Sequence, residues 1–117
     1  MAECFYHPDE SRRLRRLREL KPEMFRGFVD FERAVFRGGE LPLKTKELIA
    51  IAVAHITQCP YCIDVHVKRA KKAGASDGEI AEAIFVAMTL RAGGSFAHAA
   101  IALRAAEEAD RKSESIG

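Results

Sequence analysis

Apolar residues recur at three- and four-residue steps along most of this chain, and that spacing constrains its fold more than any other feature. The clearest example follows Pro22, where the apolar residues are Met24, Phe25, Phe28, Phe31, Val35 and Phe36. Such steps place side chains on one face of an α-helix, whereas a half-buried strand would alternate apolar and polar residues. The sequence therefore predicts an all-α protein.

Prolines, glycines and capping residues divide the chain into segments. Pro22 and Pro60 suit the first turn of a helix, and Ser76 with Glu79 has the spacing of a capping box. The run from Leu48 to Ala54 is apolar on every side, which predicts a central helix buried all round. We expect helices over residues 9–20, 22–36, 45–57, 60–73 and from 76 onward, with the last one bent or split at Gly93-Gly94.

Composition and charge exclude several classes of protein. A length of 117 residues with 48% hydrophobic and 31% charged content indicates one domain spanning residues 1–117. The net charge of +2, from 19 basic and 17 acidic residues, is too balanced to indicate a nucleic-acid or membrane partner. Five arginines in SRRLRRLREL accompany a leucine stripe, which is typical of an amphipathic helix. No apolar run approaches the roughly 18 residues of a membrane span, and we expect a cytoplasmic protein.

The stretch HITQCPYCIDVHVKRAKKAG, residues 55–74, contains the residues best suited to chemistry. With Cys59 at the helix cap, Cys59, Cys62 and His66 fall within an arc of about 60° on one helical face. We expect the helix start to favour the thiolate of Cys62, and His66 to exchange a proton with it. Cys59 is then placed to form a disulfide with Cys62. The pattern predicts a redox-active thiol pair.

Other interpretations of the same residues have to be weighed. CPYC also occurs in glutaredoxins, but that fold requires strands and a proline after the motif, and none of the four prolines follows it. Haem attachment requires histidine where Ile63 stands. A zinc site formed by His55, Cys59, Cys62 and His66 is a rival, and so is a purely structural helical oligomer with two packed thiols.

Glu47, twelve residues before Cys59, and His66, four after Cys62, extend the motif. This combination resembles the alkylhydroperoxidase AhpD-like branch of the carboxymuconolactone decarboxylase family over a core of about residues 20–105. The resemblance implies a helical bundle of about five to six helices that assembles as a homo-oligomer, a trimer or a hexamer. It also implies an alkylhydroperoxidase-type peroxidase in which Cys62 attacks the hydroperoxide and Cys59 resolves the product, while His66 and Glu47 relay protons.

The same resemblance bears on cofactors and partners. No bound cofactor is expected, and the disulfide would be reduced by an external dithiol such as a lipoyl-bearing protein. The type enzyme has histidine at the position of Tyr61, so this relay would have one imidazole fewer. Because the true decarboxylases of the family do not rely on the cysteine pair, decarboxylation is the less favoured chemistry.

Three further residues have weaker assignments. We expect His55 to be a polar residue between helices and His98 to be a packing residue, unless a neighbouring subunit's site recruits it. Cys4 has no motif partner nearby in the sequence.

Overall fold

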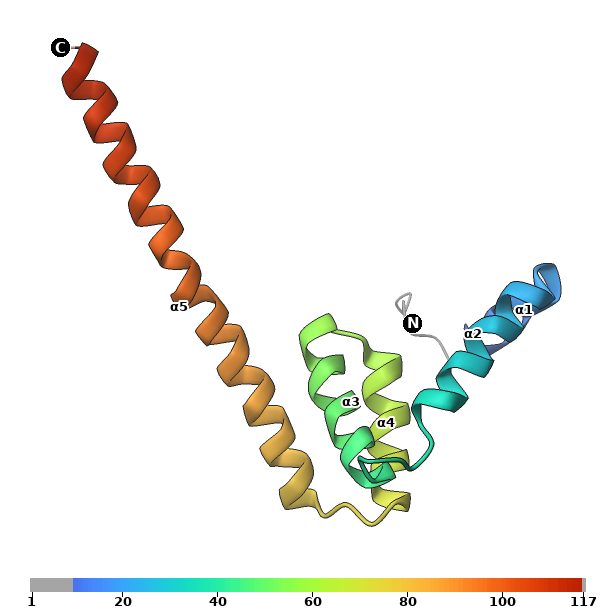
Figure 1. Cartoon of the computed structure of the whole chain (residues 1–117). Coiled ribbons are helices and arrows are strands. Elements are labelled where there is room, and N and C mark those ends of the chain that lie inside the picture. The colour runs from blue at the N-terminus through green and yellow to red at the C-terminus, as the bar shows by residue number, and fades with distance from the viewer. Residues whose placement is uncertain (1–9, 117) are drawn as a thin grey trace, which may run out of the picture.

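The computed structural model describes residues 10–116 and contains no strand among them. Its five helices are α1 (Glu10–Leu20), α2 (Pro22–Val35), α3 (Leu43–Thr57), α4 (Pro60–Lys72) and α5 (Asp77–Ile116) (Figure 1). The all-α prediction is confirmed, and the predicted boundaries agree with these to within about two residues up to the start of α5. The predicted cap Asp9, together with Cys4, lies outside the described residues.

Helix α3 lies at the centre of the fold and packs on both α4 and α5. The buried core consists of Ile51, Ala70, Ala75 and Ile80, with Leu48, Val67 and Ile84 packed against it. Burying a side chain such as Ile51 contributes about 1.5–3 kcal/mol. The central position of α3 confirms the prediction from its apolar sequence.

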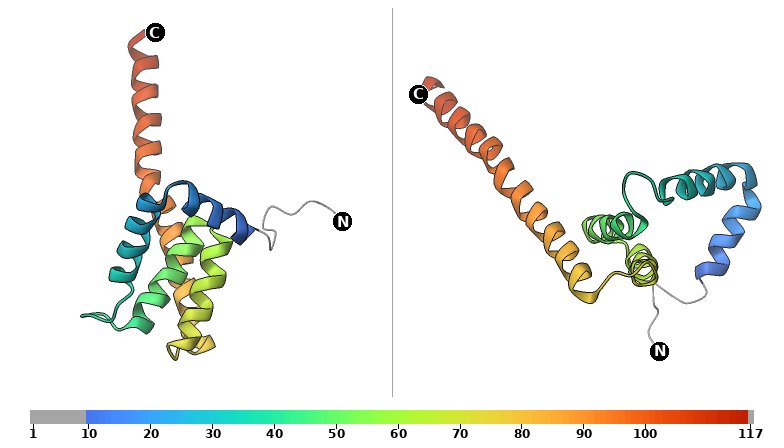
Figure 2. Two further views of the ribbon diagram at one scale, coloured as in Figure 1. Left: turned by 90° about the vertical axis from the view of Figure 1, so that its right-hand side faces the viewer. Right: turned by 60° about the horizontal axis from the view of Figure 1, so that its bottom comes forward.

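The prediction that α3 is buried on every side is wrong for the single chain. Ile49 and Val53 are about half exposed, at 48% and 52%. The physical reason is that α1 and most of α2 extend away from α3 (Figure 2). Only the end of α2, at Ala34, Val35 and Phe36, reaches the hollow that Ile49 and Val53 line, and no described residue of α1 does. The end of α2 is the part of that helix held close to α3. The Lys46 ammonium group on α3 holds it there by donating hydrogen bonds to the backbone oxygens of Val35 and Arg37.

A very short junction joins α3 to α4. Gln58 ends α3 in the left-handed conformation, with φ 56° and ψ 51°, and its N–H bonds the Ala54 carbonyl. Cys59 follows as the N-cap of α4, and Pro60 is the first helical residue, as predicted. One left-handed residue therefore reverses the chain and places Cys59 at the helix start.

Helix α5 is continuous over 40 residues, so the expected bend or split at Gly93-Gly94 is wrong. A glycine costs a helix about 1 kcal/mol relative to alanine but still donates its N–H, and the neighbouring alanines favour the helix. The start of α5 is the predicted capping box. Ser76 Oγ accepts the Glu79 N–H at 3.1 Å, and the Glu79 carboxylate accepts the Ser76 N–H at 2.9 Å.

The outer half of α5 projects well beyond the α3–α4 pair (Figures 1 and 2). The radius of gyration is 21.2 Å, whereas a compact chain of this length would have about 13 Å. Large apolar side chains remain exposed along α5, among them Phe85, Leu90, Phe96 and Leu103. The single chain therefore leaves extensive apolar surface uncovered.

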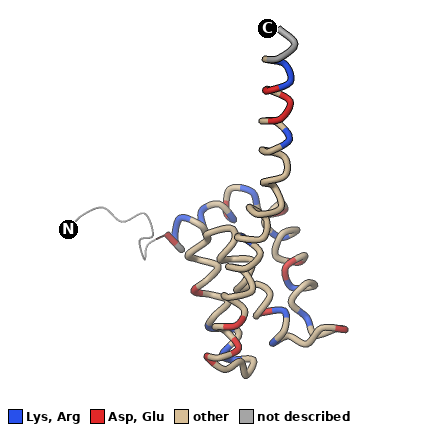
Figure 3. Tube along the Cα trace, turned by 90° about the vertical axis from the view of Figure 1, so that its left-hand side faces the viewer, with Lys and Arg blue, Asp and Glu red and all other residues tan. Residues whose placement is uncertain are grey.

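By length and composition α5 could also cross a membrane, which differs from the sequence-based expectation. This is weak evidence, because a core helix of a soluble protein passes the same test. Charged residues of both signs mark the outer part of α5, and a stretch with few charges precedes them (Figure 3).

Candidate active site

Cys59 and Cys62 lie on the first turn of α4, both partly buried and both free thiols. Cys59 Sγ accepts the backbone N–H of Cys62 at 3.2 Å. This is the geometry of a helix N-cap, in which the capping side chain receives one of the N–H groups that the first turn leaves unpaired.

The two thiols are electrostatically unequal. A hydrogen bond from the Cys62 thiol lowers the pKa of Cys59 from its ordinary value of 9.0, and the Cys62 backbone N–H lowers it further. The same thiol contact raises the pKa of Cys62, and burial adds to that rise. Of the two thiols, Cys59 is therefore the one that loses its proton first as the pH rises.

The prediction that the helix start favours the thiolate of Cys62 is therefore wrong. The physical reason is the contact with Cys59: the hydrogen bond between the two thiols raises the pKa of Cys62, and burial and the charge on Cys59 raise it further. The backbone N–H of Cys62 lowers the pKa of Cys62, as the helix start predicts, but these effects outweigh it.

Glu47 and His66 meet as expected, although they are 19 residues apart in the sequence. His66 Nδ1–H donates to Glu47 Oε2 at 2.6 Å, which joins α4 to the first turns of α3. Glu47 is only 2% exposed, and this hydrogen bond stabilises its buried carboxylate. Because Nδ1 is occupied, Nε2 is the nitrogen left to exchange a proton with another group.

Phe36 completes the surroundings of His66. The two rings are stacked, with centroids 5.1 Å apart and planes inclined by 24°. Phe36 caps the C-terminus of α2 and thereby fixes the orientation of the imidazole from a third helix. The sequence indicated Phe36 only as one member of an apolar helical face, and its role beside His66 depends on the placement of α2 against α4.

Cys62 and His66 line two apolar hollows on either side of the site. One, of about 610 Å³, has aliphatic walls that include Val35, Leu41, Ile49 and Val53. The other, of about 400 Å³, has aromatic walls that include Phe28, Phe31 and Tyr61. Cys59 lines neither hollow, so a small molecule that enters either one reaches Cys62 first.

The four residues of the predicted zinc site do not converge. No group of three or more His, Cys, Asp or Glu side chains within residues 10–116 is arranged to hold a metal. His55 Nδ1–H instead donates to the Ile51 carbonyl at 2.8 Å, within its own helix. His98 is exposed on α5 and donates to the Gly94 carbonyl, so neither histidine joins the cysteines in this chain.

Comparison with known proteins identifies the group to which this fold and site belong. A sequence model of the carboxymuconolactone decarboxylase family matches residues 22–105. The chain belongs to this family. The resemblance recognised in the sequence is thereby confirmed.

Relatives within the carboxymuconolactone decarboxylase family agree with this assignment. Uncharacterized protein 4 of the cox locus of Paracoccus denitrificans is 51% identical over 83 residues, which cover 71% of this chain and 75% of that protein. A family member from Legionella pneumophila is 39% identical, with a TM-score of 0.68 and coverage of 86% of this chain and 89% of that one.

A third member, from Thermotoga maritima, is 38% identical with a TM-score of 0.54, over 56% of this chain and 68% of that one. A role in the antioxidative response has been suggested for that protein. The helical fold of this chain is thus that of solved members of the family.

Proposed function

We propose that this protein is a thiol-dependent peroxidase that reduces organic hydroperoxides through Cys62 and Cys59. The observation that carries the proposal is the buried hydrogen bond between Glu47 and His66. His66 and Cys62 together line both apolar hollows. The antioxidative role suggested for the Thermotoga relative points in the same direction.

In the first step, His66 Nε2 takes the proton of the Cys62 thiol, and the Glu47 carboxylate stabilises the resulting imidazolium. The raised pKa of Cys62 is the reason that a base is required. The Cys62 thiolate attacks the outer oxygen of the hydroperoxide and breaks its O–O bond. Cys62 becomes a sulfenic acid, and the organic oxygen leaves as an alcohol after taking the proton from His66.

In the second step, Cys59 attacks the sulfur of the sulfenic acid and water leaves as a disulfide forms. The lowered pKa of Cys59 favours its thiolate, which is the attacking form; a hydrogen bond from the Cys62 side chain is the larger cause, and the Cys62 N–H adds to it. An external dithiol then reduces the disulfide and becomes a disulfide itself. A lipoyl-bearing protein would supply this chemistry without a cofactor bound to the chain.

A second candidate chemistry is thiol–disulfide exchange, with Cys59 as the attacking thiol. The low pKa of Cys59 favours it, because the thiolate is the attacking form. Both chemistries use the same cysteine pair and differ in the thiol that reacts first.

The proposal also includes assembly of the protein, in the cytoplasm, into a homo-oligomer that is a trimer or a hexamer. Assembly would cover the apolar surface of α5 that the single chain leaves exposed.

The test follows thiol loss and intact mass after cumene hydroperoxide is added to reduced, metal-free protein, with Cys62→Ser and Cys59→Ser variants alongside. We expect a Cys59–Cys62 disulfide in the unmodified protein, no peroxide reaction in Cys62→Ser, and an arrested sulfenic acid in Cys59→Ser. A sulfenic acid on Cys59 of the Cys62→Ser variant would reverse the two roles. Thiols that do not react with hydroperoxide would refute the peroxidase function.

A further inference from the structure

One face of α4 carries reactive and basic side chains in a single row. Cys62, His66, Arg69 and Lys72 follow one another at steps of four, three and three residues, which is the spacing of neighbours on a helical face. At a rise of 1.5 Å per residue, the ten residues from Cys62 to Lys72 span about 15 Å. The helix therefore places a thiol and a cluster of positive charge a fixed distance apart.

Helix α2 faces this row and forms the opposite wall of an elongated groove. The aromatic hollow beside Cys62 and a larger cavity of about 740 Å³ have two lining residues in common, Glu32 and Phe36. We call these two adjoining cavities the α2–α4 groove. Its Cys62 end has aromatic walls, and its other end is lined by Val29, Arg33, Leu43, Glu47, Arg69, Lys72 and Ala73.

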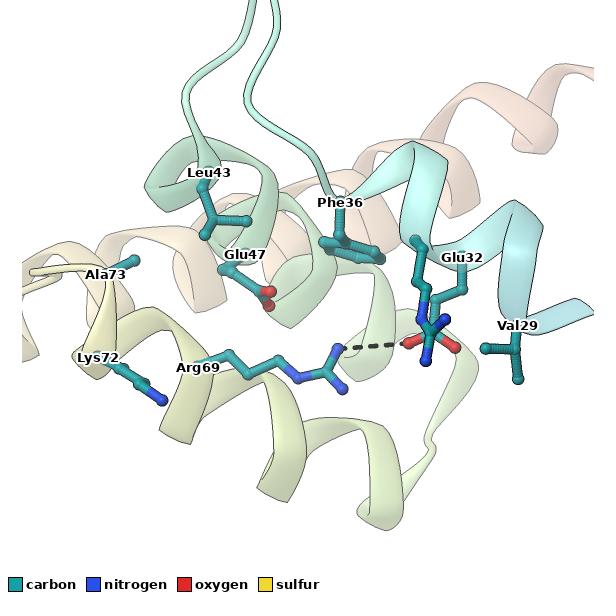
Figure 4. A pocket seen from close by; sticks show the side chains of 9 residues that line it. Val29, Glu32, Phe36, Leu43, Glu47, Arg69, Lys72 and Ala73 are labelled. Carbon is teal, nitrogen blue, oxygen red and sulfur yellow. Dashed lines mark hydrogen bonds and ion pairs between the residues drawn. The ribbon is translucent and has the colours of Figure 1, made fainter.

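The far end of the groove carries an excess of positive charge. Glu32 is paired with Arg69 at 3.3 Å, and Glu47 is hydrogen-bonded to His66. Neither Arg33 nor Lys72 forms an ion pair with any described residue, yet both line the cavity. Figure 4 shows Arg69 extending from α4 toward Glu32, whereas Lys72 lies farther along α4, next to Ala73. The lining of this cavity thus contains three positive and two negative side chains, a net charge of +1, and Arg33 and Lys72 are its two positive side chains without an ion pair in the described part of the chain.

We propose that the α2–α4 groove binds an amphipathic hydroperoxide with a carboxylate at one end. The carboxylate lies against Arg33 and Lys72, the hydrocarbon chain lies along Phe36 and Val65, and the hydroperoxide reaches Cys62. Fatty-acid hydroperoxides have this chemistry. The inference rests on the proposed peroxidase function and adds a substrate class and a recognition site to it.

The geometry of the groove also sets a length. Lys72, which contacts the carboxylate, lies about 15 Å along the helix from Cys62. An extended hydrocarbon chain advances about 1.25 Å per carbon, so about twelve carbon–carbon bonds should separate the carboxylate carbon from the carbon that carries the hydroperoxide. Linoleic acid with its hydroperoxide on carbon thirteen meets this requirement. Arachidonic acid with its hydroperoxide on carbon five falls short of it.

The decisive experiment measures binding and turnover separately. Calorimetry on the reduced protein uses the hydroxy acid that corresponds to the linoleic acid hydroperoxide, together with its methyl ester, which lacks the charge. The test variant carries both Arg33→Gln and Lys72→Gln. The control variant is Lys68→Gln, since Lys68 also lies on α4 but pairs with Asp64 outside the groove. Stopped-flow thiol oxidation then compares the two fatty-acid hydroperoxides with neutral cumene hydroperoxide.

We expect the acid to bind about tenfold more tightly than the ester, and the double variant to lose most of this difference. Lys68→Gln should retain it, and its oxidation by cumene hydroperoxide should be unchanged. Equal binding of acid and ester, or equal rates for the two positions of the hydroperoxide, would overturn the inference while leaving the peroxidase function intact. Tight, charge-dependent binding without any thiol oxidation would support the groove and refute the peroxidase function instead.

Discussion

Replacing Glu47 with glutamine should slow oxidation of Cys62 far more than it weakens the fold. The amide keeps the shape of the side chain and an oxygen that accepts the His66 Nδ1–H, so the contact between α3 and α4 is retained. What is lost is the negative charge that stabilises the imidazolium form of His66. A hydrogen bond to a charged group contributes about 1.5–3 kcal/mol and a neutral one about 0.5–1.5 kcal/mol, so about 1–1.5 kcal/mol of stabilisation is lost. At 1.4 kcal/mol per factor of ten, the rate should fall by about 5- to 12-fold.

The assay is stopped-flow oxidation of reduced protein by cumene hydroperoxide, with thermal unfolding followed in parallel. Glu82→Gln is the matched control, because this carboxylate is exposed on α5 and lines neither hollow beside Cys62. Glu47→Asp, which keeps the charge but shortens the side chain, should retain an intermediate rate. A Glu47→Gln rate within twofold of the unmodified protein would show that Glu47 serves only to stabilise the fold, and would refute the relay.

Two further predictions concern the thiols and α5. As the pH rises toward 9.0, iodoacetamide should modify Cys59 before Cys62, because a lowered pKa produces thiolate at lower pH. In the Cys59→Ala variant, Cys62 should react at lower pH than in the unmodified protein, since the main cause of its raised pKa is gone. Peptide mass spectrometry checks both predictions. Light scattering should give an oligomer whose mass is a multiple of 13.0 kDa. Phe96→Asp, which replaces a side chain that is 82% exposed, should reduce this mass while the far-UV circular dichroism spectrum stays helical. A monomeric mass for the unmodified protein would contradict the assembly.

The helices could be predicted from sequence because their limits depend on local chemistry. Pro60 lacks an N–H that the first turn leaves unpaired in any case, and Ser76 bonds a residue three positions away. Gly93-Gly94 was misjudged because glycine only weakens a helix, and its neighbours decide the outcome. The apolar run in α3 correctly marked the central helix. Periodicity does not say which neighbour covers each face, so the exposure of Ile49 and Val53 could not be predicted.

The candidate site was predictable where residues lie on one helix or match the family motif. Cys59, Cys62 and His66 share a face of α4, and Glu47 was indicated by its spacing to the cysteines. The stacking of Phe36 on His66 and the row of basic residues along the groove depend on how α2 lies against α4. No local pattern encodes that arrangement. The error over the Cys62 thiolate arose because the contact with the Cys59 thiol and burial raise the pKa of Cys62 by more than the helix start lowers it.

The junction at Gln58 limits how the length of this chain can vary. A single left-handed residue joins the helix that carries Glu47 to the helix that carries His66. One residue inserted into the first turn of α4, between the cap and His66, would turn the imidazole by about 100° relative to the cap cysteine. Insertions that a surface loop usually tolerates would therefore separate the acid from the base here. In a redesigned relative, the spacing across this turn would need to be kept as strictly as the cysteines themselves.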